Sequence, residues 1–258
     1  MNALLAVDVP PISHVTIWGN GPLGLNKTII IYGFATLATV FIFFIGTRRK
    51  DALVPGGGFV GLMQNTAESS IGFVRNQIIM QTMGPDGLGY LPYLATLFFF
   101  IFFSNITEII PAVQFPANAR FAMPMTLALV TWVIFNVVGV KRQGVGHYIK
   151  NSLIPPGVPA ALLVLVVPIE FISTFLVRPF SLSVRLFANM LAGPLILVTF
   201  ATLCAALFAA SITIVILPFS FALLVAMTGF EILVSFLQAF IFTILTAVYI
   251  GGAMHPEH

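Results

Sequence analysis

Five apolar stretches set the main constraint on the fold of this 258-residue chain, because each is long enough to cross a lipid bilayer. They occupy residues 28–46, 88–111, 123–140, 159–210 and 218–250. A helix rises about 1.5 Å per residue, so roughly 20 residues cross a hydrocarbon core about 30 Å thick. Only 7% of the residues are charged, against about 25% in an ordinary soluble domain. The sequence therefore predicts an all-α integral membrane protein with five membrane-crossing helices.

Basic residues beside these stretches indicate the orientation of the chain. Residues 48–51 read RRKD after the first stretch, and residues 141–150 read KRQGVGHYIK after the third. Two crossings separate the clusters, so both lie on one side, which the positive-inside rule makes cytoplasmic. The N-terminus is then expected outside and the C-terminus in the cytoplasm. We expect a multi-pass protein of a bacterial plasma membrane.

Residues 59–83 differ from the crossing stretches, because apolar residues recur at every third or fourth position and polar residues fill the other face. The apolar positions are Val60, Met63, Ala67, Ile71, Val74 and Ile78. Such a helix is expected to lie along the membrane surface, with an ordinary docked loop helix as the alternative. The predicted organisation is an N-terminal part, residues 1–87, and a core, residues 88–258. The core holds a helical hairpin at 88–140 and two long helices at 159–250.

The last two apolar stretches are too long to stand upright in a bilayer. Residues 218–250 form a helix of about 50 Å, against a hydrocarbon core of about 30 Å. To span that core as one helix they must lean by about 50°, beyond the usual range of about 0–40°. A partner other than lipid is therefore expected to hold the last two helices at a strong tilt.

Polar side chains form a row at helical spacing on each of these two long stretches. The rows are Arg178, Arg185 and Asn189 on the first and Glu231, Ser235 and Gln238 on the second. A charged side chain near the bilayer centre costs about 2.5–3.5 kcal/mol, so its position needs a reason. One interpretation is that the arginines snorkel to headgroups and that Glu231 pairs with one of them. Arg185 has apolar sequence on both sides, which favours a functional role.

The chemistry of arginine narrows that role. A guanidinium keeps its proton in proteins, so Arg185 is a fixed positive charge and not a proton relay. At about 4 Å and an effective dielectric constant of about 20, it attracts a carboxylate by about 4 kcal/mol. A carboxylic acid brought to it is driven to release its proton. Glu231, Gln238, Asn105 and Glu108 would form a water-accessible path to such a site, since ionisable residues inside spans commonly mark ion routes.

Three motifs resemble a known family. Residues 181–195 read SLSVRLFANMLAGPL, residues 230–250 read FEILVSFLQAFIFTILTAVYI, and residues 104–111 read SNITEIIP. Together they resemble the core of subunit a of the F-type ATP synthase, over about residues 88–252. The resemblance implies a proton-translocating stator subunit that couples the proton gradient to ATP synthesis. Such a subunit is not catalytic by itself and carries no cofactor.

The resemblance also implies partners and roles. In this family the two long helices lie slanted against a rotating ring of c subunits, each with a membrane-embedded carboxylate. The peripheral-stalk subunit b and the lipid bilayer complete the surroundings. Arg185 matches the essential arginine between two aqueous half-channels, and Glu170 resembles the acidic residue of the cytoplasmic half-channel. The residues expected to serve ion translocation are Arg185, Glu231, Gln238, Asn189, Asn105, Glu108 and Glu170.

Two positions depart from the family pattern. Pro194 follows LAG, where the family commonly has Glu or His, so the usual polar partner across from Glu231 is absent. Glu170 lies one residue farther from Arg185 than the family pattern has it. The residues of the two half-channels, the proton inlet and the proton outlet, therefore do not match the family pattern position by position.

Other function classes find less support. Basic residues form short clusters rather than a patch, which argues against nucleic-acid binding. A secondary transporter in which Arg185 binds an anionic substrate is the alternative, but the chain shows no internal repeat. A membrane-bound hydrolase needs a nucleophile with its base or a metal cluster, whereas the four histidines lie in loops or tails and Cys204 is the single cysteine. The coupling ion, H⁺ or Na⁺, would be bound by the ring and is not specified by this chain.

Overall fold

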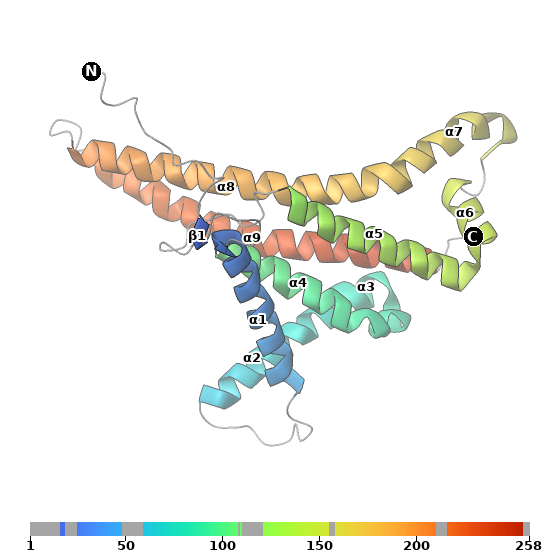
Figure 1. The fold of residues 1–258 in the computed structure, drawn as a ribbon, viewed down its shortest axis with the longest axis horizontal. Coiled ribbons are helices and arrows are strands. Elements are labelled where there is room, and N and C mark those ends of the chain that lie inside the picture. Colours follow the sequence, from blue (N-terminus) through green and yellow to red (C-terminus); the bar gives the residue numbers. More distant parts are fainter. Residues whose placement is uncertain are drawn as a thin grey trace.

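The structure is a computed structural model that describes residues 16–18, 25–47, 59–107, 109, 121–154, 158–209 and 216–254. In these ranges the chain is almost wholly helical (Figure 1). The exception is a short antiparallel hairpin of β1 (Thr16–Trp18) and β2 (Leu25–Asn26). Within the described residues, five helical segments are long and apolar enough to cross a membrane. The predicted all-α membrane fold is confirmed.

The helices follow the apolar stretches of the sequence closely. The N-terminal part holds α1 (Lys27–Thr47), α2 (Phe59–Phe73), the π turn η1 (Val74–Ile79), α3 (Met80–Thr82) and the 3₁₀ segment η2 (Gly84–Tyr90). The core holds α4 (Leu91–Ile106), α5 (Ala122–Gln143), α6 (Val145–Leu153), α7 (Ala160–Ile172), the π turn η4 (Ser173–Val177), α8 (Arg178–Ala209) and α9 (Leu217–Met254).

The two longest helices, α8 and α9, run side by side along the molecule (Figure 1). Two contacts show that they are antiparallel. Near the end of α8, the Cys204 Sγ lies 3.2 Å from the Ser220 Oγ near the start of α9. At the other end, the Arg178 guanidinium lies 5.3 Å from the centre of the Tyr249 ring. These contacts fix the register of α8 on α9. At about 1.5 Å per residue, the 38 residues of α9 extend about 57 Å, so its length exceeds an upright span as predicted.

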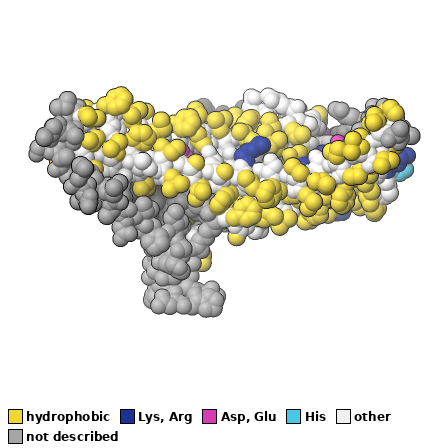
Figure 2. Space-filling model, turned by 90° about the horizontal axis from the view of Figure 1, so that it is seen from above, with side chains coloured by type: hydrophobic (Ala, Val, Ile, Leu, Met, Phe, Trp, Pro, Cys, Tyr) yellow, Lys and Arg dark blue, Asp and Glu magenta, His cyan; other side chains and the backbone are white. Residues whose placement is uncertain are grey.

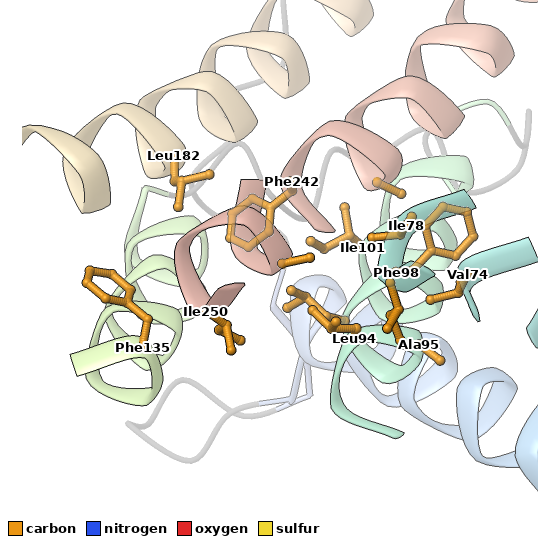
Figure 3. Close-up of a cluster of buried hydrophobic side chains, with 14 of the residues drawn as sticks. Val74, Ile78, Leu94, Ala95, Phe98, Ile101, Phe135, Leu182, Phe242 and Ile250 are labelled. Carbon is orange, nitrogen blue, oxygen red and sulfur yellow. The ribbon is translucent and has the colours of Figure 1, made fainter. Parts of the chain in front are cut away.

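The hydrophobic core lies around the second half of α9, which packs against α4, α5 and α8. In Figure 3, Phe242 of α9 lies between Leu182 of α8 and the side chains of α4 and η1. Phe73 extends this core, with its ring 5.7 Å from that of Phe236. By contrast, only 6% of the most apolar part of segment Leu162–Phe208 is buried inside the chain. The α7–α8 side is therefore a long apolar surface that other elements of the described chain leave uncovered.

The amphipathic pattern of residues 59–83 is confirmed as a division of faces. Ala67, Val74 and Ile78 are buried, whereas Glu68 and Arg75 are exposed. The apolar face docks on α1 through α2 and on α4 and α9 through η1. The position of this helix along the membrane surface stays a prediction.

A tight junction of α5 and α6 closes the end of the bundle next to the second basic cluster. Gly144 has a φ of 78°, a left-handed conformation that favours glycine, and it reverses the chain between the two helices. A Cβ atom on Gly139 would overlap the Tyr148 ring, so the close packing of α6 on α5 requires glycine there. Burial raises the pKa of the Tyr148 hydroxyl, and this hydroxyl donates to the Asn136 Oδ1 at 3.1 Å. The Gln143 Nε2 donates to the Ala253 carbonyl at 2.9 Å and ties this junction to the end of α9.

Candidate functional site

Arg185 is exposed on α8. Within the described residues it has no hydrogen bond, ion pair or aromatic contact, and the small residues Ser181, Ala188 and Ala192 on the same side are exposed as well. Large apolar side chains, including Phe180 and Leu195, are exposed beyond them. Figure 2, seen from the α8 side, shows basic atoms near the middle of a long hydrophobic face. The guanidinium is therefore open to a partner that approaches closely over small side chains.

Arg178 lies in a different environment, although it has the same charge and lies seven residues earlier. Its guanidinium is partly buried and stacks over the Tyr249 ring. A cation over an aromatic ring gains about 0.5–2 kcal/mol. Arg178 therefore holds α8 against α9. Neither arginine forms an ion pair with Glu231 in the described part of the chain, so the interpretation that Glu231 pairs with one of them finds no support.

The polar row of α9 is buried. The exposed fraction is 6% for Glu231, zero for Ser235 and 6% for Gln238. The Glu231 Oε1, the Ser235 Oγ and the Gln238 Nε2 have no hydrogen-bond partner among the described residues. Leaving such an atom unsatisfied costs about 1–3 kcal/mol, and buried polar atoms are normally bonded to protein or to water. A row of polar atoms without protein partners is therefore a place where we expect water inside the membrane.

The antiparallel register brings α8 residues to this row. Counting equal numbers of residues from the Cys204–Ser220 and Arg178–Tyr249 contacts places Asn189 level with Ser235 and Gln238. The same counting places Pro194 level with Glu231. The Asn189 Nδ2 is also buried and has no hydrogen-bond partner in the described ranges. Asn189 therefore belongs to the same polar region as the α9 row.

Asn105 comes to this region from α4. The Phe102 ring lies 6.4 Å from the Phe236 ring, whereas Met83, before α4, lies beside Gly251. The helix α4 thus runs antiparallel to α9, and its end approaches the level of Glu231. Asn105 is fully buried there. Glu108, predicted to act with it, lies outside the described residues.

Glu170 lies apart from this polar region, in α7, where it is partly buried. Fifteen positions separate it from Arg185, which is about 22 Å along a helix. The π turn η4 lies between them, and its Arg178 N–H donates to the Ser173 carbonyl five residues back. A π turn holds one more residue than an α turn. It therefore rotates the residues before the turn, Glu170 among them, relative to Arg185 from the positions that a continuous α-helix would give them.

The adjacent Pro179 explains why the turn widens at this point. Proline has no N–H and its ring clashes with the carbonyl four residues back, so an α turn is disfavoured there. Sequence reasoning missed this turn and the Arg178–Tyr249 contact. The Arg-Pro pair at 178–179 was the available signal for the turn. No three His, Cys, Asp or Glu side chains of the described residues come together in a way that could hold a metal ion.

Comparison with known proteins agrees with this geometry. The family model described as ATP synthase A chain matches residues 29–251. The chain is 46% identical to "ATP synthase subunit a" of Frankia alni, over 93% of this chain and 81% of that protein. It is 43% identical to the Rhodococcus erythropolis protein of the same name, over 92% of this chain and 85% of that protein. It is 41% identical to the Rhodopseudomonas palustris protein of that name, over 88% of this chain and 87% of that protein. The chain therefore belongs to the ATP synthase A chain family, that of the proton-translocating membrane subunit a of F-type ATP synthases.

Proposed function

We propose that this chain forms two water-filled half-channels, one from each side of the membrane, that meet a rotating ring of c subunits at Arg185. The observation that carries the proposal is the position of Arg185 between two polar regions. The buried row of Glu231 and Gln238 lies toward one end of α8, and Glu170 lies toward the other. Arg185 itself is open on a surface that no described element of this chain covers. Protons enter by one region and leave by the other.

The roles follow from the chemistry of each group. Glu231 exchanges protons in the inlet, where Gln238, Asn189 and Asn105 order the water around it, together with Glu108. Arg185 holds a ring carboxylate in its ionised form and so forces each arriving carboxylic acid to release its proton. Glu170 serves the outlet on the cytoplasmic side. The chain does not catalyse ATP synthesis itself, and subunit b of the peripheral stalk is the other protein partner that we propose.

The uncovered α7–α8 face supports a ring as the partner. An apolar face of this length would fit lipid alone, but an open guanidinium among its side chains would then have only hydrocarbon beside it, which is costly. A ring of helices that each carry a carboxylate would cover the apolar surface and would also supply a negative charge beside Arg185. The same contact would hold a helix of the length of α9 at the tilt that its length requires in a bilayer.

Copurification tests this assignment directly. We expect an affinity tag on the chain to recover, from membranes in mild detergent, an oligomeric ring of small hairpin subunits, subunit b and a soluble ATPase. An unrelated multi-pass protein with the same tag, taken through the same steps, is the control. Recovery of the chain without ring or ATPase, from membranes that contain both, would contradict the proposed complex and would favour a transporter.

The proposed orientation predicts a labelling pattern. In a Cys204→Ser background, cysteines at positions 20 and 120 should react with an impermeant maleimide from outside, and one at Gln143 only from the cytoplasm. Positions 20 and 120 lie outside the described residues. Gln143 bonds Ala253, so Gly146→Cys is the matched second site, since a Cβ there meets nothing within 4 Å. Labelling of positions 20, 120 and 143 from one side would exclude the five-crossing topology.

A further inference from the structure

Pro194 frees a backbone carbonyl inside α8. Proline has no N–H, so the carbonyl of the residue four positions earlier, Met190, receives no helical hydrogen bond from it. Met190 is fully buried, and Gly193 is buried too. Ala192 and Leu195, on the other side of the helix, are exposed. The freed carbonyl therefore lies on the packed side of α8, away from the uncovered face.

Pro168, in the interior of α7, differs from Pro194. Pro168 lies on α7, and both it and Val164, four positions earlier, are exposed. A proline inside a helix is destabilising, and a buried carbonyl without a partner is destabilising as well. The carbonyl freed by Pro168 lies on the exposed side of α7. The carbonyl freed by Pro194 lies inside the protein, near the polar region.

Two buried polar side chains lie near the level of the freed carbonyl. The register of α8 on α9 places Pro194 level with Glu231, whose Oε1 is buried without a partner in the described chain. The Asn189 Nδ2, next to Met190 in the sequence, is a buried donor that also lacks a partner there. A carbonyl only accepts, an amide NH₂ only donates, and a water does both twice. A water that donates to the Met190 carbonyl and to Glu231 satisfies both acceptors, and Asn189 supplies a donor to the same polar region.

We propose that the Met190 carbonyl, freed by Pro194, is a positioning group that anchors the water through which Glu231 exchanges protons. This inference rests on the proposed function and deepens it. A backbone carbonyl does not titrate, so it orients the water without competing for the proton. Pro194 thus takes the place of a polar side chain at this level of the inlet, by exposing the backbone of its own helix.

Restoring the backbone N–H at position 194 tests whether the freed Met190 carbonyl affects proton conduction. Pro194→Ala returns an N–H to the Met190 carbonyl, and we expect passive proton conduction through the membrane sector to fall about tenfold, the effect of about one hydrogen bond. Pro194→Gln, which also restores the N–H but supplies a side-chain acceptor, should recover conduction to within about threefold of the parent. Pro168→Ala is the matched control and should conduct as the parent does. Equal conduction by Pro194→Ala and the parent would overturn the inference, and if Glu231→Gln is impaired in the same assay the proposed function still stands.

A spectroscopic test is independent of conduction. Met190–Leu191 is the single Met–Leu pair in the chain, so 1-¹³C-Met and ¹⁵N-Leu labelling selects one carbonyl in solid-state NMR. In the assembled complex, with only this chain labelled, the Met190 carbonyl signal should differ between the parent and Glu231→Leu. In Pro194→Ala it should move to an ordinary helical position and become insensitive to residue 231. An identical signal in the parent and Glu231→Leu would overturn the inference, even where Pro194→Ala fails to assemble.

Discussion

Arg185→Lys is expected to abolish ATP-driven proton pumping, with a loss of at least about a hundredfold, while the complex still assembles. The side chain contacts no other described residue through a hydrogen bond, an ion pair or an aromatic ring and is exposed on α8, so its replacement removes no such contact within the described part of the chain. Lysine keeps the charge in water but loses its proton readily when it is desolvated. The substitution also replaces a planar guanidinium, which has five N–H donors, by a compact ammonium group. Against a ring carboxylate the fixed charge is therefore lost.

Inverted membrane vesicles provide the measurement, with ATP-driven quenching of a pH-sensitive dye as the readout. Arg178→Lys is the matched control, because it makes the same chemical change on the same helix. Arg178 lies over the Tyr249 ring, and an ammonium retains a cation–π contact there. Pumping by Arg178→Lys should therefore stay within about twofold of the parent. Near-normal pumping by Arg185→Lys would show that a permanent charge is not what this position supplies.

Glu231→Gln is expected to slow proton entry by about a hundredfold or more, a typical contribution of a positioned acid–base group. Glutamine keeps the size and the hydrogen-bonding ability of the side chain but cannot titrate. The residue is 6% exposed, so it exchanges protons only through the local polar region. Position 194, which is level with Glu231, holds a proline and therefore has no ionisable side chain. Glu231 is therefore expected to be the titrating group of the inlet, without an ionisable partner at position 194.

Two assays measure the effect of Glu231→Gln: ATP synthesis driven by a pH gradient, and passive proton conduction after the soluble ATPase is stripped off. Gln238→Leu is the comparison, because it removes a hydrogen-bonding side chain from the same row. Its cost should be smaller, about tenfold, since the water that it orders retains other partners. If Glu231→Gln conducts as well as the parent, Glu231 is a structural residue and the inlet takes another route.

The helices and the polar rows were predictable from sequence because their causes are local. Inside a bilayer each segment must satisfy its own backbone hydrogen bonds, so an apolar run of sufficient length becomes a helix. Helical spacing then places Glu231, Ser235 and Gln238 on one face whatever surrounds them. The same reasoning predicted which side of residues 59–83 is buried. None of these conclusions needs to know which helices are neighbours.

The environment of each polar side chain was decided by the tertiary structure. Arg178 and Arg185 lie seven residues apart, a spacing that predicts the same face of a helix. Arg178 nevertheless stacks on Tyr249, whereas Arg185 is exposed. The π turn η4 interrupts the α-helical periodicity between Glu170 and Arg185. Only the antiparallel register of α8 on α9 brings Pro194 to the level of Glu231. The physical reason is that burial and hydrogen-bond partners depend on packing between helices far apart in the chain, which local periodicity does not encode.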